Sequence, residues 1–184
     1  MTGFTEILTV ILSSLAVIAL LGALVAFYAA YARSSIGVRI REYIGPKSLV
    51  LALLVAAGAA AGSLLYSYAA GFVPCDLCWY QRVFLFPQVV ILAVALAKGD
   101  RGAGRYGLAL SIPGALIALY HTYIQLAGSG TLLPCAAAGA ACSKVYFLEW
   151  GFITIPTMSL IAFLALIAFY LVHGKASRSI KRLI

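Results

Sequence analysis

Five long apolar segments constrain the fold of this chain more than any other feature. A helix needs roughly 20 mostly apolar residues to cross the hydrocarbon core of a bilayer. The segments run approximately over Ile7–Tyr31, Ser48–Phe72, Cys78–Ala97, Tyr106–Ala127 and Gly151–His173. In lipid the backbone must satisfy its own hydrogen bonds, which favours helices for such segments. We therefore expect an all-α integral membrane protein with five transmembrane helices, folded as a single membrane domain over residues 1–184.

The composition agrees with a lipid environment. Hydrophobic residues make up 64% of the chain and charged residues only 10%, whereas soluble domains carry about 25% charged residues. The first apolar segment, 7–31, raises the alternative of a cleaved signal peptide. However, the preceding MTGFTE has no basic residue, and the apolar run is longer than the usual stretch of about 7–15 residues in such signals. We expect this segment to be a retained helix.

The basic residues predict how the helices are oriented. Eleven of the 13 Lys and Arg residues fall into the connections 32–47 and 98–105 and the tail that follows residue 173. These parts share one side if the chain crosses the membrane five times, and basic loops mark the cytoplasmic side. We expect a multi-pass protein of the plasma or inner membrane, with its N-terminus outside and its C-terminus inside. The net charge of +8 then reflects orientation and attraction to the lipid bilayer, so no nucleic-acid partner is expected.

All four cysteines fall on the predicted outer side. They form two pairs in two outer loops, Cys75 and Cys78 within residues 73–78 and Cys135 and Cys142 within residues 128–150. Disulfides form and persist outside the cytosol, where thiols are not kept reduced. The two pairs therefore predict two disulfides or dithiols on the extracytoplasmic side.

Three uses of these pairs are compatible with their spacing. A C-x-x-C disulfide closes so short a loop that it removes little entropy from the unfolded chain, and strained, exposed disulfides tend to be labile and catalytic. Structural disulfides are the second use, and a zinc site is the third. Zinc sites favour closely spaced pairs, often with histidine, whereas here Cys135 and Cys142 are seven positions apart and neither loop contains histidine. The pattern favours redox chemistry, and we expect no metal.

Arg82 follows Cys78 by four residues, so the two share one face of the third predicted helix. At 1.5 Å per residue, the arginine lies roughly 6 Å deeper in the membrane. A charged side chain inside a membrane helix is a candidate functional residue; the alternative is that it snorkels to the headgroups. If Arg82 has a function, its positive charge should act on a negative charge nearby. One candidate is a thiolate at Cys78, near the positive helix N-terminus; the other is a quinone that gains charge on reduction.

His121, in the fourth predicted helix, lies at a similar depth, roughly 8–9 Å below the outer end of that helix. Gln125 is four residues further on and shares its face. Histidine can donate a hydrogen bond or relay a proton to a reduced quinone; the alternative is a histidine that is hydrogen-bonded within the bundle. The predicted cofactor-binding residues are Arg82, His121, Gln81 and Gln125.

Three motifs resemble the DsbB/BdbC family of disulfide-bond formation proteins. They are PCDLCWYQR, YHTYIQ in the fourth segment, and WGFITIPTMSLIAF after the second cysteine pair. The resemblance covers roughly residues 48–173, and the close spacing of the second pair favours the BdbC-like branch. It implies a four-helix bundle that oxidises a soluble DsbA-like protein of thioredoxin fold outside the cytoplasm. It also implies that the electrons pass to a membrane quinone, ubiquinone or menaquinone.

The resemblance also implies roles for individual residues. Cys78 matches the quinone-proximal cysteine and Cys75 its shuttling partner. Cys135 and Cys142 match the pair that exchanges with the soluble protein, and Cys135 the cysteine that forms the mixed disulfide. Arg82 matches the arginine of the quinone site. His121 in turn matches a histidine near that site.

Two features of the chain depart from the family pattern. The helix 7–31 and the basic loop 33–47 have no counterpart in the four-helix core.

One alternative function is a quinone reductase of the vitamin K epoxide reductase type, which places its C-x-x-C after the loop pair; here the C-x-x-C comes first. The other is a non-enzymatic membrane scaffold with structural disulfides. The order of the motifs favours the DsbB-like thiol:quinone oxidoreductase.

Overall fold

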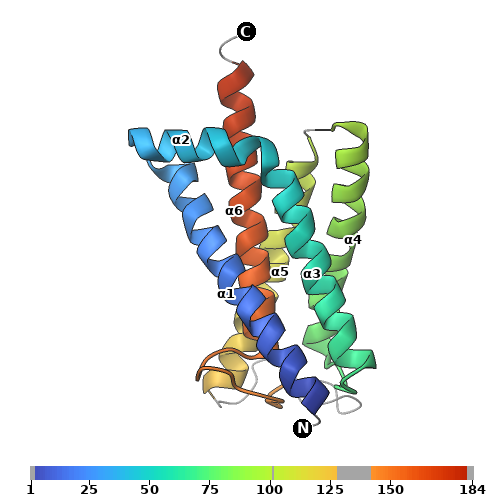
Figure 1. Cartoon of the computed structure of the whole chain (residues 1–184). Helices are drawn as coiled ribbons and strands as arrows, with labels where there is room; N and C mark the ends of the chain where they lie inside the picture. Colours follow the sequence, from blue (N-terminus) through green and yellow to red (C-terminus); the bar gives the residue numbers. More distant parts are fainter. Residues whose placement is uncertain (1–2, 101, 128–141, 182–184) are drawn as a thin grey trace.

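The computed structural model describes residues 3–100, 102–127 and 142–181, and it is almost entirely helical (Figure 1). Five of its helices are long and apolar enough to cross a membrane. They are α1 (Gly3–Tyr31), α3 (Ser48–Tyr68), α4 (Asp76–Lys98), α5 (Ala103–Ala127) and α6 (Ile155–Lys181). The prediction of an all-α chain with five candidate transmembrane helices is confirmed.

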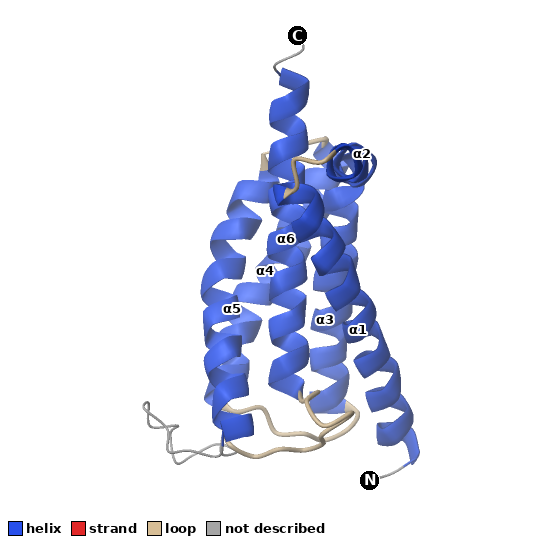
Figure 2. Ribbon diagram, turned by 90° about the vertical axis from the view of Figure 1, so that its left-hand side faces the viewer, coloured by secondary structure: helices blue, strands red, loops and turns tan. Residues whose placement is uncertain are grey.

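Helix α6 lies at the centre of the bundle, and α1, α3 and α5 pack around it (Figure 2). Its side chains form much of the core; Phe163, for example, is fully buried. Two glycines of α5 allow the helices to come close. A Cβ at Gly107 would lie 2.3 Å from the Tyr170 ring, and a Cβ at Gly114 would lie 2.4 Å from the Phe163 ring. Such small residues at interfaces are a common way for membrane helices to pack.

The basic stretch 33–47, predicted as a loop, contains a helix instead. Helix α2 (Ser35–Ile44) begins after Ser34, whose hydroxyl accepts a hydrogen bond from the backbone N–H of Gly37 at 3.2 Å. This is a standard N-cap. Ile40 and Ile44 pack against the core, whereas Arg39 is exposed and Arg41 is half-buried. Helix α2 therefore lies across the end of the bundle as an amphipathic segment (Figure 1), a geometry typical of helices at a membrane interface.

Two helices stop short of their predicted boundaries at the other end of the bundle. Helix α3 ends at Tyr68 rather than at residue 72, and α6 begins at Ile155 rather than at residue 151. A turn occupies residues 150 and 151, because both Trp150 (φ 50°) and Gly151 (φ 78°) adopt left-handed conformations. That backbone cannot continue a right-handed helix, although the apolar sequence there suggested one.

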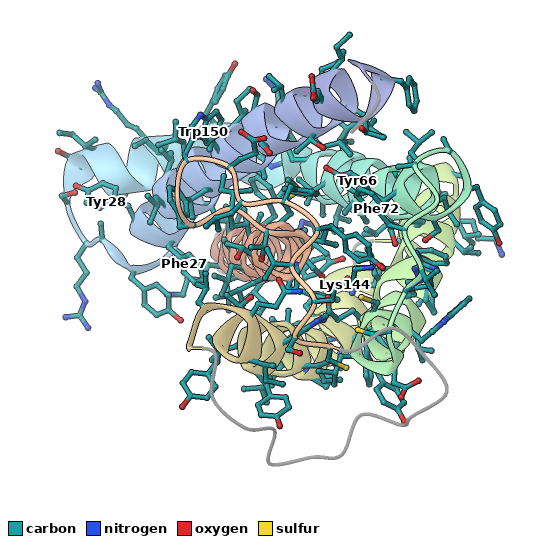
Figure 3. The ribbon with its side chains drawn as sticks, turned by 90° about the horizontal axis from the view of Figure 1, so that it is seen from below. Phe27, Tyr28, Tyr66, Phe72, Lys144 and Trp150 are labelled. Atoms are coloured by element: carbon teal, nitrogen blue, oxygen red, sulfur yellow. The ribbon has the colours of Figure 1, made fainter. Side chains whose placement is uncertain are left out.

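The N-terminus, both cysteine-bearing segments of the described structure and the turn at Trp150 lie at one end, and the C-terminus and α2 lie at the other (Figures 1 and 3). The segment from Lys144 to Trp150 crosses the end of α6, next to Tyr66 and Phe72 (Figure 3). Phe72 stacks on Tyr146, with ring centroids 4.3 Å apart. The cysteine end of the bundle is therefore covered by an aromatic layer.

Candidate redox site

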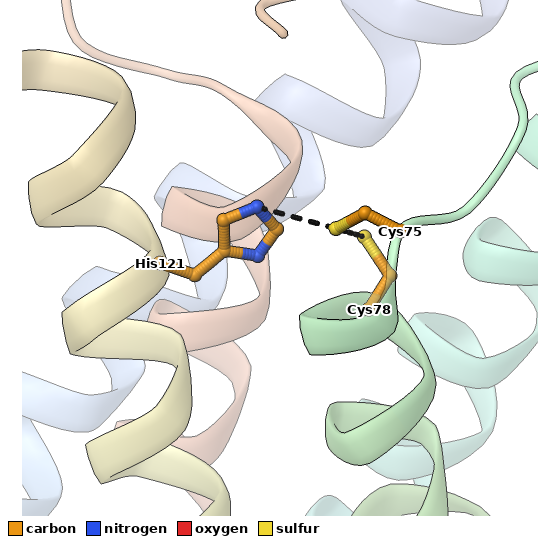
Figure 4. Close-up of side chains that lie close together, drawn as sticks. All are labelled: Cys75, Cys78 and His121. Atoms are coloured by element: carbon orange, nitrogen blue, oxygen red, sulfur yellow. Dashed lines mark hydrogen bonds between the residues drawn. The ribbon is translucent and has the colours of Figure 1, made fainter. Parts of the chain in front are cut away.

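Cys75 and Cys78 lie together at the N-terminus of α4. Cys75 is the N-cap, with extended backbone, and its side chain does not cap the helix. Instead its Sγ lies 3.3 Å from Sγ of Cys78, one turn into the helix, and both are free thiols (Figure 4). Pro74 precedes the helix and Asp76 lies in its first turn, where a negative charge complements the helix dipole. The C-x-x-C spacing thus brings two thiols within reach of a disulfide.

His121 reaches the same dithiol from α5 (Figure 4). Its Nε2 lies 3.6 Å from Sγ of Cys75 and 3.1 Å from the backbone carbonyl oxygen of Cys142, and its Nδ1 lies 3.0 Å from Nε2 of Gln81. Because a carbonyl oxygen can only accept, Nε2 of His121 carries the proton. Nδ1 then accepts from the Gln81 amide. Gln81 thereby selects the tautomer that points an N–H at Cys75 and Cys142.

These neighbours lower the pKa of the Cys75 thiol well below its usual value near 9. The main cause is that the thiolate accepts a hydrogen bond from Cys78; burial opposes the shift, and His121 adds to it. The N-terminal position on α4 favours the same ionisation. The sequence suggested a thiolate at Cys78 as one of two candidates for the charge near Arg82, and the surroundings lower the pKa of the neighbouring Cys75 thiol.

Arg82 does not snorkel to the surface but is buried, with 8% of its surface exposed. Its Nε donates to Oγ of Ser63 at 2.8 Å, and its Nη2 donates to the Ser63 carbonyl at 2.9 Å and to Oγ of Ser67. The guanidinium also lies 4.9 Å from the centre of the Trp79 ring. Nη1 has no hydrogen-bond partner among the described residues. Arg82 is therefore held by α3 with two N–H groups left over for a ligand.

A cavity of about 800 Å³ opens beside these groups, between α1, α3, α4 and α6. Three of the predicted site residues line it, namely Cys78, Gln81 and Arg82. Most of the remaining lining is apolar, which is the usual character of pockets for small molecules and cofactors. An apolar cofactor with a polar, electron-accepting end fits this cavity, because its polar end would meet Cys78 and Arg82.

Other predicted site residues lie on the far side of the dithiol. Cys75, His121 and Gln125 do not line the cavity. Gln125 donates to the carbonyl of Lys144 at 2.9 Å and, more weakly, to that of Cys142 at 3.4 Å. It therefore holds the backbone of the second cysteine loop against α5.

The second cysteine pair is described in part. Cys142 is disulfide-bonded and buried, and it shares a small apolar cluster with Cys75. Cys135 lies outside the described residues. The Cys142 carbonyl and the Cys75 sulfur both approach one atom, Nε2 of His121. The two loops therefore meet at His121.

Comparison with known proteins settles the family. The model for the family described as disulfide bond formation protein DsbB matches residues 46–173, more than half of the chain. The chain belongs to the DsbB family. Disulfide bond formation protein C of Bacillus subtilis is 42% identical to it over 126 residues, 67% of this chain and 91% of that protein. A probable disulfide formation protein C of Bacillus cereus is 42% identical over 135 residues, 67% of this chain and 94% of that protein.

More distant relatives extend the same pattern. A probable disulfide formation protein of Coxiella burnetii is 36% identical over 130 residues, 67% of this chain and 88% of that protein. No solved structure matches the chain significantly. As a DsbB-family member, the protein is a membrane oxidoreductase of disulfide bond formation, which is the reaction class predicted from its motifs. The match begins at residue 46 and leaves α1 and α2 outside it.

Three polar side chains of this DsbB-family site were not predicted from the sequence. Ser63 and Ser67 hold Arg82, and Tyr146 lines the cavity and donates to the Val73 carbonyl at 3.0 Å. The two serines are four residues apart within an otherwise apolar helix, so they share a face. That spacing could have predicted a polar contact on this face of the helix.

The dithiol and His121 could also hold a metal ion. The ligand atoms of Cys75, Cys78 and His121 lie within 4.8 Å of one another. Structural zinc takes four such ligands, and no fourth His, Cys or carboxylate joins the group in the part of the chain that the structure describes. The set resembles a redox dithiol with a histidine neighbour more than a closed zinc site.

Proposed function

We propose that this protein is a membrane thiol:quinone oxidoreductase that reoxidises a DsbA-like protein of thioredoxin fold outside the cytoplasm. The observation that carries the proposal is the cavity, in which a reactive thiol and an incompletely bonded buried arginine meet an apolar, membrane-embedded space. Quinones are apolar enough to arrive through lipid, and when bound they supply a two-electron, two-proton acceptor. The residues that would hold the polar end are Cys78, Gln81 and Arg82.

The electrons enter at the second cysteine pair. The dithiol of the soluble protein is oxidised to a disulfide as the Cys135–Cys142 disulfide is reduced, with Cys135 forming the transient mixed disulfide. The reduced pair then exchanges with a Cys75–Cys78 disulfide, which becomes a dithiol. Support for this second exchange comes from His121, which contacts both Cys75 and the backbone of Cys142.

The chain's own residues prepare the last step. The Cys75 thiolate and the Cys78 thiol give up two electrons and one proton as they close to a disulfide. The unused Nη1 of Arg82 would stabilise negative charge that develops in the cavity, and such preorganised donors are effective where water is excluded. The basic loops support an orientation with both cysteine pairs outside the cytoplasm, in a plasma or inner membrane.

The test is anaerobic quinone reduction by the purified protein, with a reduced DsbA-like protein as electron donor. We expect the wild-type protein to reduce a quinone and oxidise the donor in equal amounts. The Cys78→Ser variant should reduce quinone only at the background rate. Quinone reduction at the wild-type rate in Cys78→Ser would refute the proposal. In a Cys142→Ala variant, the Cys135 thiolate should attack the disulfide of the oxidised DsbA-like protein, which releases one of its thiols and leaves a mixed disulfide at Cys135.

A further inference from the structure

Helix α1 lies outside the family match, yet it supplies one wall of the cavity. Eight of the residues that line the cavity belong to α1, between Leu12 and Val25. The other walls are formed by residues of α3, α4 and α6 that fall within the matched region. A four-helix core without α1 would leave this side of the cavity open to lipid. The extra helix therefore changes the shape of the site beside Cys78.

The way α1 packs explains why a cavity remains. Helix α1 packs against α6 and has few direct contacts with α3. The two helices come close where Leu12 approaches Gly62, whose Cβ position would be 3.2 Å from that leucine. Elsewhere the two helices diverge and α6 lies between them, as the upper half of Figure 1 shows. The result is a groove with α6 as its floor and α1 and α3 as its sides.

The groove is long and has one polar end. Its lining on α3 extends from Leu51 to Ser67, about 24 Å at 1.5 Å per residue. Cys78 and Arg82 lie at the end nearest the cysteine loops, and Ile44 of α2 lines the opposite end. Small residues keep the middle open, since a Cβ on Gly58 would meet no atom within 4 Å. A ligand that fills this groove carries a small polar head and a long, thin apolar tail.

We infer that α1 completes a binding groove for the polyprenyl tail of the quinone, which places the headgroup at Cys78 and Arg82. The inference rests on the proposed function, since it concerns the same acceptor. A quinone is the occupant whose two parts match the two parts of the groove, and the groove is continuous with the redox thiol. The tail lies against α1 on one side and α3 on the other. Helix α1 is thus part of the acceptor site as well as a membrane anchor.

The experiment compares two acceptors that share a headgroup and differ in the tail, such as menaquinone-4 and menadione, or ubiquinone-2 and ubiquinone-0. The variant Gly58→Leu places a side chain in the groove. Its matched control is Ala61→Leu, one turn away on the exposed surface of α3 and outside the cavity lining. The kcat/KM is measured for both acceptors, with the DsbA-like protein as the electron donor.

For the wild-type protein and Ala61→Leu, we expect the tailed quinone to be the better acceptor. In Gly58→Leu, kcat/KM for the tailed quinone should fall about tenfold, because the new side chain displaces about two methylene groups of the tail. The value for the tailless quinone should stay unchanged, which also shows that the variant is folded. Photo-cross-linking with a diazirine-tailed quinone should label α1 between residues 12 and 25.

Different results would contradict the proposed function and the groove assignment. If wild-type protein reduces neither quinone, the proposed function itself is wrong. If it reduces both but Gly58→Leu keeps the full preference for the tail, or if the tail labels no residue of α1, the groove assignment is overturned. A phospholipid retained in native mass spectrometry by the wild type and lost in Gly58→Leu, with the tail preference intact, would assign the groove to an acyl chain instead.

Discussion

Helix α4 carries two buried glutamines that are seven residues apart, and their surroundings differ. Gln88, in the middle of the bundle, accepts hydrogen bonds from the hydroxyls of Ser111 at 3.0 Å and Tyr170 at 2.8 Å, and its own amide donates to the Phe84 carbonyl. Every group in this cluster finds its partner inside the protein. A closed polar cluster of this kind ties three helices together.

Gln81, two turns nearer the cysteine end, belongs to a polar cluster in which some groups have no partner among the described residues. Its neighbours include a free dithiol, a histidine with its proton directed at that dithiol, and an arginine with an unused Nη1. Both glutamines are buried polar groups in a membrane helix, so burial alone does not mark function. The difference is that the set around Gln81 leaves reactive or donor groups facing a cavity.

The largest effect is expected at Arg82. Replacing Arg82 with alanine should lower kcat/KM for quinone about 100-fold, as removal of one preorganised donor does in other enzymes. Arg82→Lys is the matched control, because it retains a charge but loses the planar fork that Ser63 and Ser67 hold. We expect an intermediate loss. The measurement is steady-state quinone reduction, and equal activity of Arg82→Ala and wild type would mean that the arginine only supports the fold.

A second effect concerns the Cys75 thiolate. Its lowered pKa means that the thiolate persists at pH values where an ordinary cysteine is protonated, so alkylation by iodoacetamide should stay fast below neutral pH. The hydrogen bond from residue 78 is the main cause. The midpoint is the pH at which Cys75 is alkylated at half its maximal rate. Cys78→Ser keeps a hydrogen-bond donor and should retain a low midpoint, whereas Cys78→Ala should shift the midpoint to higher pH.

Replacing His121 with alanine in the Cys78→Ser background should also raise this midpoint, by less than Cys78→Ala does, because His121 is the smaller contributor. Peptide mass spectrometry after alkylation across a pH series identifies the modified cysteine. Identical midpoints in all of these variants would show that the low pKa has another origin.

A smaller effect is expected at Gln125, which holds the loop of the second cysteine pair. Gln125→Ala removes a hydrogen bond to the Lys144 carbonyl, and one such bond contributes about 1 kcal/mol. Exchange between the two cysteine pairs should therefore slow about fivefold. Quenched-flow thiol trapping measures the exchange, while quinone reduction from prereduced Cys75 and Cys78 should be unaffected. A loss of that second reaction would place Gln125 in the acceptor site.

The smallest effect on activity is expected in the closed cluster. Gln88→Leu leaves the Ser111 and Tyr170 hydroxyls without their acceptor, at a cost of about 1–3 kcal/mol in stability. We expect a lower Tm in detergent and an unchanged turnover per folded molecule. A kinetic defect as large as that of Arg82→Ala would remove the distinction between the two glutamine clusters.

Much of this molecule could be predicted from local sequence. The apolar segments predicted the long helices, because their hydrophobic length is a property of consecutive residues. The C-x-x-C spacing predicted the neighbouring thiols, because one helical turn brings such positions together. Helix α2 could also have been predicted. Ser34 is a typical N-cap residue, and the isoleucines at 36, 40 and 44 fall on one face of a helix.

The local sequence therefore determined the long helices, the paired thiols and the position of Arg82 one helical turn after Cys78. Only the tertiary structure decided what surrounds them. The serines that hold Arg82 are 15 and 19 positions away on another helix, and His121 reaches Cys75 across 46 positions. The cavity depends on how α1 and α3 diverge over α6. These features arise from the packing of helices against one another, and the hydrophobic pattern of each helix alone does not encode which neighbour it meets or at what angle.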